Sequence, residues 1–157
     1  MAVARFYHLT NTPLEGLLPV LIGKSLEIGL KVAVRGTSEA RMQGVDRQLW
    51  MGDGFLPHGL AGGPHDSEQP ALLVWDDAPA TNLPNAPGCL IALDGAEVSA
   101  AEAQEIERLC IVFDGTDTDA VVRARAQWRE LTGAGVAAEY WSRESGKWER
   151  KAVHPKV

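Results

Sequence analysis

Long apolar runs are missing from this chain of 157 residues. No window approaches the roughly 18 to 20 uninterrupted apolar residues that a transmembrane helix needs. The first residues also show no charged region followed by a long apolar run, as a secretory signal would. We therefore expect a cytoplasmic protein that has no membrane partner.

Cysteine is also scarce, with Cys89 and Cys110 the two examples. Neither has the CxxC or Cys/His spacing of a metal site, which argues against a zinc site and against a disulfide. Both lie beside or inside short apolar runs, a position typical of small core residues in strands. We expect neither a bound metal nor a cofactor.

Basic residues are outnumbered, with 15 Lys and Arg against 21 Asp and Glu, which gives a net charge of -6. Because affinity for phosphate backbones comes from clustered Lys and Arg, duplex DNA is not expected to be the main partner. Acidic side chains dominate between residues 66 and 109, whereas basic ones outnumber acidic ones from residue 116 onward. This distribution predicts an acidic protein or peptide partner at the basic end, with nucleic acid contacted only indirectly.

The apolar pattern predicts an α/β domain, because short apolar runs alternate with longer segments of helical periodicity. We expect a single three-layer domain with a mostly parallel sheet, Rossmann-like or nucleotide-hydrolase-like without a functional phosphate loop. The domain should cover residues 1–151 and be followed by a short tail, residues 152–157. Expected strands are 5–9, 31–35, 71–75, 89–93 and 109–113, with 136–141 and 147–151 able to pair. Expected helices are 13–29, 37–50, one beginning after residue 99, and 116–132; segments 53–70 and 76–88 read as loops.

Capping signals support these helices. Thr12 can cap the first helix and Pro13 suits its first position, while Pro19 should kink the helix or move its start. Ser99 followed by Glu102 has the spacing of a capping box.

The triplet Gly23-Lys24-Ser25 is reminiscent of the end of a phosphate-binding loop. Such a loop requires another glycine five positions before Gly23, and Leu18 stands there. The triplet also falls within or at the end of an expected helix, where backbone N–H groups would not be free to bind phosphate. Nucleotide binding at this triplet is therefore not expected.

An enzymatic alternative rests on His58 and Asp114. His58 with Asp53 or Asp114 would form a general base, and the chain would then be a hydrolase or a nucleotide-dependent transferase. A structural role for His58, hydrogen-bonded to loop backbone, is favoured because no nucleophile elbow accompanies it. Asp114 and the pair Asp76-Asp77 follow strands, where α/β enzymes place catalytic carboxylates, but they are also common turn formers.

The last expected helix carries a sharper signal. An apolar stripe repeats at helical spacing, with Arg125 and Arg129 beside it on the same side as Val122. The stripe consists of Val121, Ala124, Trp128 and Leu131. Two guanidinium groups beside an indole suit a carboxylate attached to a hydrophobic group. The alternative is that Trp128 is a core residue and the arginines are solvated.

Apolar side chains also occur in a segment too rich in Gly and Pro to be a helix, residues 52–62. Phe55 lies between Gly54 and Leu56 on this loop and is a candidate for an exposed anchor. Trp50 lies at the end of the preceding helix, a place where a tryptophan is more often a core residue. A role in contacting a partner is the alternative.

Three blocks of sequence resemble one known family and follow its order. They are residues 5–9 (RFYHL), Leu49-Trp50 followed by Phe-x-Pro-His-x-Leu-Ala-Gly over residues 55–62, and residues 113–115 followed by 122–129. Together they are similar to the chi subunit family of bacterial DNA polymerase III, a clamp-loader accessory protein. The resemblance implies a non-catalytic subunit that links the clamp loader to single-stranded DNA-binding protein.

The resemblance also implies two partner-binding surfaces. In the family, a basic-x-x-aromatic-basic pattern on the last helix holds the acidic, Phe-ending tail of single-stranded DNA-binding protein. The pattern carries over to Arg125, Trp128 and Arg129, with Val122 beside them; Arg129 stands where the family often has lysine.

The second surface engages the psi subunit, another clamp-loader component or a competing helicase. It carries over to Phe55, Trp50, Pro57, His58 and Leu60. Direct binding of nucleic acid by the basic C-terminal end is a third possibility.

Overall fold

The computed structural model describes residues 3–10, 13–52, 56–76, 78–143 and 145–155. These residues form an eight-stranded sheet in the order β3-β4-β2-β5-β6-β1-β7-β8. Neighbouring strands are parallel except β7 and β8, which are antiparallel. The strands are β1 (Val3–Leu9), β2 (Val32–Arg35), β3 (Gly59–Leu60), β4 (Ala71–Val74), β5 (Cys89–Leu93), β6 (Arg108–Asp114), β7 (Ala137–Ser142) and β8 (Glu149–His154). The α/β class and the mostly parallel sheet predicted from the sequence are confirmed.

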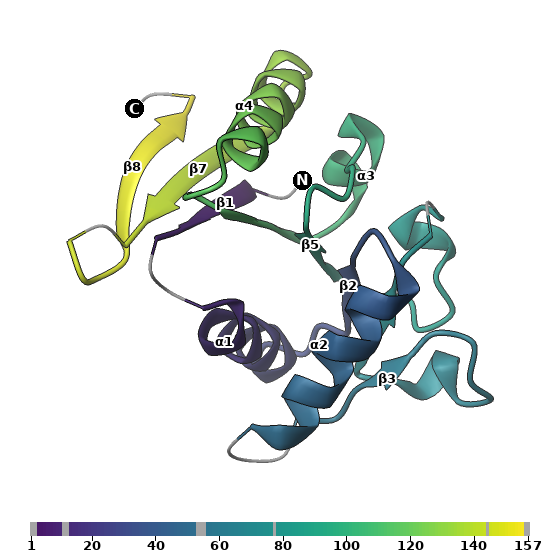
Figure 1. Cartoon of the computed structure of the whole chain (residues 1–157). Helices are drawn as coiled ribbons and strands as arrows, with labels where there is room; N and C mark the ends of the chain where they lie inside the picture. Colours follow the sequence, from purple (N-terminus) through teal and green to yellow (C-terminus); the bar gives the residue numbers. More distant parts are fainter. Residues whose placement is uncertain (1–2, 11–12, 53–55, 77, 144, 156–157) are drawn as a thin grey trace.

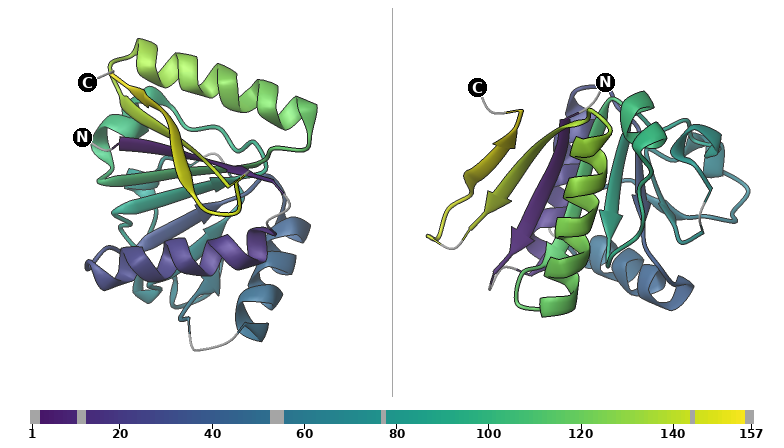
Figure 2. Two further views of the ribbon diagram at one scale, coloured as in Figure 1. Left: turned by 90° about the vertical axis from the view of Figure 1, so that its left-hand side faces the viewer. Right: turned by 90° about the horizontal axis from the view of Figure 1, so that it is seen from above.

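Helices cover both faces of the sheet and complete a three-layer arrangement (Figure 1). Helices α1 (Leu14–Glu27) and α2 (Glu39–Met51) lie on one face, and α3 (Ala100–Glu105) and α4 (Thr118–Gly133) on the other. Figure 2 shows α1 and α4 flanking the sheet, with the β7–β8 hairpin at its edge. Short 3-10 helices occur at Asp66–Glu68 and Ala80–Asn82. No helix in the described ranges is long and apolar enough to cross a membrane.

The central strands are buried along their whole length because helices cover both faces. Side chains of β1 alternate between the two resulting cores: Phe6 packs on the α4 side, whereas Tyr7 packs against the α1 side. Cys89 and Cys110 are buried free thiols of the α1-side core. Their predicted role as small core residues in strands is confirmed.

Pro19 lies inside α1 without moving its start, which is Leu14. The missing N–H of Pro19 removes one bond, the one that the carbonyl of Glu15 would accept, and the rest of the helix continues. Pro13 occupies the N-cap position, and Thr12, the expected cap, lies outside the described residues.

The other helices start within two residues of their expected positions. Ser38 caps α2 by accepting a hydrogen bond from the Arg41 N–H, so this helix begins at Glu39. Asp117 caps α4 through its side chain, which accepts hydrogen bonds from the N–H groups of Asp119 and Ala120. Capping requires an acceptor directly before the first turn, and Asp117 meets that condition.

Most strands lie within two residues of their expected bounds, and two observations depart further from the expectation. β3 consists of two residues within a segment expected to be loop, and it pairs in parallel with β4 at Leu72 and Leu73. A strand this short shows no alternating pattern in the sequence. β8 runs to His154, three residues past the expected domain boundary at 151, and His154 pairs with Ala138 of β7.

Candidate functional site

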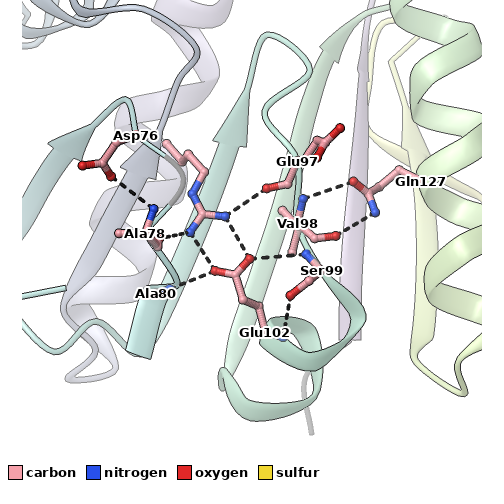
Figure 3. A network of polar contacts seen from close by, with 9 residues as sticks. Asp76, Ala78, Ala80, Glu97, Val98, Ser99, Glu102 and Gln127 are labelled. Atoms are coloured by element: carbon pink, nitrogen blue, oxygen red, sulfur yellow. Dashed lines mark hydrogen bonds and ion pairs between the residues drawn. The ribbon is translucent and has the colours of Figure 1, made fainter. Parts of the chain in front are cut away.

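The carboxyl edge of the sheet, where α/β enzymes place their ligands, holds a buried ion pair. Arg35 ends β2 and is 3% exposed. Its guanidinium donates to both carboxylate oxygens of Glu102, at 2.7 and 3.0 Å, and to the carbonyls of Ala78 (2.8 Å) and Glu97 (2.9 Å). This pair therefore joins β2, α3 and the loop before the second 3-10 helix (Figure 3).

Glu102 forms the capping box predicted from the sequence and also binds Arg35. Its carboxylate accepts from the N–H of Ser99 at 3.3 Å and of Ala80 at 2.8 Å, while the Ser99 hydroxyl accepts from the Glu102 N–H. Burial alone would raise the pKa of this carboxyl, but the hydrogen bonds and charge of Arg35, with the two N–H donors, lower the pKa on balance. Arg35 and Glu102 are therefore bonded to each other and to groups within the fold, which gives the pair a structural role.

His58 and Asp114, the enzymatic alternative, do not come together. His58 directly precedes β3, and Asp114 ends β6, four strands further along the sheet. Neighbouring strands lie about 4.8 Å apart, so the sheet alone separates the two positions by roughly 19 Å. The strand register adds to this distance, because His58 precedes β3 at the amino edge of the sheet and Asp114 lies at the carboxyl edge. Asp114 is exposed, and hydrogen bonds from the Thr116 hydroxyl and N–H lower its pKa. Asp53, the other partner considered for His58, lies outside the described residues.

Gly23-Lys24-Ser25 lies in the last turns of α1. The Ser25 hydroxyl donates to the carbonyl of Leu21 at 2.9 Å and lies 3.4 Å from the Cys89 sulfur. The triplet is therefore helical and partly buried, as the sequence predicts, and does not form a phosphate loop. Asp76, the described member of the other candidate pair, accepts from the Ala78 N–H as a turn former does.

His58 fastens its loop to α2. Its side chain is buried, with Nδ1 2.7 Å from the Leu56 carbonyl and Nε2 3.1 Å from a carboxylate oxygen of Asp46. The Trp50 ring packs over the imidazole at 4.2 Å between centroids. The structural interpretation of His58 agrees with these contacts. Because it is buried, His58 positions the loop and does not itself present a contact surface.

Apolar side chains are exposed beside this loop. Trp50 is 53% exposed and Met51 is 83% exposed, so the core position favoured for Trp50 is wrong. Trp50 follows the buried Leu49 at the end of α2 and points outward because the helix turns by about 100° per residue. Pro57 and Leu60 are partly buried, and Phe55 lies outside the described residues.

A small apolar groove of about 190 Å³ adjoins Met51 between α1 and α2. Its lining includes Leu14, Leu18, Pro19, Val45 and Leu49. Sequence analysis missed both Met51 and this groove. Met51 stands next to Trp50 and before Gly52, which was a usable signal, whereas the groove depends on how α1 packs against α2.

The α4 residues fall into the two groups that the sequence predicts. Ala124 and Leu131 are buried against the sheet, and Val121 and Trp128 are partly buried there. Val122 is 57% exposed, and Arg125 and Arg129 are exposed.

The two arginines lie one helical turn apart, which places their Cβ atoms about 5 to 6 Å from each other. Neither Arg125 nor Arg129 forms an ion pair within the described part of the chain. Their positive charge therefore faces solvent on one side of α4, next to Val122.

The indole of Trp128 packs against the core on one side and is partly exposed on the other. Its ring packs edge-on against Phe6 at 5.3 Å and lies 6.3 Å from Tyr140. The core interpretation therefore holds for one side of the indole, and the ring remains partly exposed on the core side of the two arginines.

The described fold is an α/β domain whose exposed basic and apolar side chains lie on helix faces. The chain belongs to the DNA polymerase III chi subunit family: the model of this family, described as DNA polymerase III chi subunit, HolC, matches residues 1–139. No curated protein sequence matches the chain. The family resemblance predicted from the sequence is confirmed. Membership gives the chain an accessory role in DNA replication, in association with clamp-loader components of DNA polymerase III.

Proposed function

We propose that this protein is a non-catalytic adaptor that links the clamp loader to single-stranded DNA-binding protein. The observation that carries the proposal is the exposed face of α4, where Arg125 and Arg129 lie one turn apart beside Val122 and the anchored ring of Trp128. This face suits an acidic peptide that ends in an aromatic residue.

The proposed chemistry divides the ligand between two kinds of contact. Arg125 and Arg129 bind carboxylates of the acidic C-terminal tail through charge-assisted hydrogen bonds. Trp128 and Val122 contact the terminal aromatic ring and remove apolar surface from water. Because the arginines have no carboxylate partner among the described residues, no internal ion pair must break before the tail binds.

The second proposed surface faces the clamp loader and is formed by Trp50, Met51, Pro57 and Leu60, with Phe55 as the expected anchor. Its partner is the psi subunit, another clamp-loader component or a helicase that competes for the same surface. Exposed Trp50 and Met51 and the apolar groove between α1 and α2 support this assignment. Apolar contacts of this kind supply the hot spots of protein interfaces.

Met51→Asp is expected to weaken binding of the clamp-loader component by about tenfold or more, because it places a charge in an apolar contact. The melting temperature should stay nearly unchanged, since Met51 is 83% exposed. Titration calorimetry with the purified component measures the affinity. Gln43→Asp, an exposed position about two turns earlier on α2 that does not line the groove, provides a control for added charge. Equal affinity for wild type and Met51→Asp would place the contact elsewhere.

Binding to bare and to coated DNA distinguishes this proposal from its alternatives. Strong, stable capture by single-stranded DNA only when the cognate binding protein coats it supports the adaptor. Equally strong capture by bare DNA would replace the adaptor with a nucleic-acid binder, and turnover of a nucleotide or ester substrate would replace it with an enzyme. The same DNA coated with binding protein that lacks its tail should capture little of the chain.

A further inference from the structure

We propose that the groove between α1 and the β7–β8 hairpin is a contact site for a short segment of single-stranded nucleic acid. The groove has a volume of about 780 Å³ and lies on the α1 face of the sheet, opposite α4. β1 and β6 supply Arg5, Tyr7 and Arg108, and α1 supplies one wall. The other wall consists of Trp141, Arg143, Gly146, Lys147 and Trp148. This volume is in the range of ordinary ligand sites.

The charge of the groove is opposite to that of the whole chain. Five of its side chains are basic: Arg5, Lys24, Arg108, Arg143 and Lys147. None of the described residues that line it is acidic, although the chain has a net charge of -6. A concave surface that gathers one sign of charge concentrates ligands of the other sign.

Two of these five cations, Lys24 and Lys147, have no charged partner among the described residues, and the other three are partly engaged. Arg5 pairs with Glu139 at 3.3 Å, and the Nε of Arg143 donates to the Gly146 carbonyl. Arg108 is partly buried at the base of the groove, where its side chain lies beside the Cys110 thiol. Lys24 and Lys147, on opposite walls, are exposed and form no ion pair with a described residue.

Aromatic rings lie between the cations. Trp148 packs edge-on against Tyr7, with ring centroids 5.5 Å apart and planes at 88°. Trp141 donates from its indole N–H to Glu139, which also pairs with Arg5 and thereby holds both side chains at the groove. Partly buried rings beside cations are the combination that single-stranded nucleic acid requires, because its bases stack while its phosphates are neutralised.

The arrangement favours a nucleic-acid strand over an acidic peptide. The cations come from β1, β6, α1 and the hairpin and are spread along the groove. They therefore match a strand that carries one phosphate charge on each nucleotide. A carboxylate cluster is better held by a compact arginine pair, as on α4. The chain also belongs to a family of DNA polymerase III subunits. The groove residues from the β7–β8 hairpin lie beyond the residues that the family model matches; they are Trp141, Arg143, Gly146, Lys147 and Trp148.

The test is fluorescence anisotropy of a labelled oligothymidylate about ten nucleotides long. We expect weak binding at low salt, with a dissociation constant of about 1 to 100 μM and a log–log salt slope of about -2 to -3, as three or four phosphate contacts give. Lys24→Glu with Lys147→Glu should weaken binding at least about tenfold. Lys31→Glu with Arg47→Glu makes the same change of charge at exposed positions outside the groove. This control variant should lose less affinity for the oligonucleotide than the groove variant does.

Three outcomes would overturn this proposal. They are no binding at low salt, equal weakening in the two charge-reversal variants, and loss of acidic tail-peptide binding in the groove variant with no loss of oligonucleotide binding. The last would assign the groove to the peptide. Circular dichroism melting of both variants checks that they fold. Tail binding by the Arg125 and Arg129 variants is measured separately, so failure of the α4 proposal and failure of the groove proposal are distinguishable.

Discussion

Glu102→Ala is expected to lower the free energy of unfolding by about 3 to 5 kcal/mol, because it leaves the buried guanidinium of Arg35 without its charge partner. The substitution also removes the capping box of α3 and the acceptor of the Ala80 N–H. Urea unfolding at neutral pH measures the loss. Glu105→Ala in the same helix is the matched control, since Glu105 is exposed and should cost less than about 0.5 kcal/mol.

Replacing both charged partners tests the cause of this loss. Arg35→Met with Glu102→Met should recover a large part of the stability, because neither charge is then buried alone and apolar groups fill the space. If Glu102→Ala costs no more than Glu105→Ala, the pair is not the structural link between β2 and α3 that its contacts indicate.

Acid should remove the same stabilisation. The pKa of Glu102 is lower in the folded than in the unfolded protein, so its contribution is fully present above the unfolded value of about 4.3. It is lost as pH falls through the lower, folded pKa. The difference in unfolding free energy between wild type and Glu102→Gln should therefore shrink as pH falls below about 4. A difference that grows with acid would contradict the lowered pKa.

Arg125→Ala with Arg129→Ala is expected to weaken binding of an acidic tail peptide by about 100-fold or more. Each charge-assisted contact at such a site contributes about 1.5 to 3 kcal/mol, and about 1.4 kcal/mol corresponds to tenfold. Both side chains are exposed, so the melting temperature should change little. Anisotropy of a labelled peptide measures the affinity.

Three comparisons sharpen this second prediction. Arg123→Ala removes the same charge from the same helix but on the side that faces the carboxyl edge of the sheet, so it should bind nearly as wild type does. Added salt should weaken wild type more than the double variant, because screening acts on charges that are present. Removing the terminal Phe of the peptide should weaken binding about as much as losing one arginine. Unchanged affinity in a folded double variant would remove α4 from the site.

Local signals explain why much of the fold is predictable. Burial on both faces produced the continuous apolar strands β2, β4 and β5, and the capping box at Ser99 marked α3. The stripe on α4 separated Ala124 and Leu131 from the exposed arginines because a helix repeats every 3.6 residues. These patterns depend on neighbours in sequence and can be read without knowing the packing.

Features that depend on distant residues were not predictable in this way. Arg35 and Glu102 are 67 positions apart, and nothing near either residue indicates the other. The groove cations range from Arg5 to Lys147 and meet only because β6, β1 and β7 are adjacent in the sheet. The helical repeat places Trp50 outward only once Leu49 is known to be buried, and the burial of Leu49 depends on how α2 packs.

The central claim, adaptor function through an acidic tail, is tested most directly by titration calorimetry against two forms of the cognate single-stranded DNA-binding protein. One form is complete and the other lacks its C-terminal tail. The account predicts saturable binding of the complete protein and no measurable binding of the shortened one. Equal binding of both forms, or binding of neither, would contradict it.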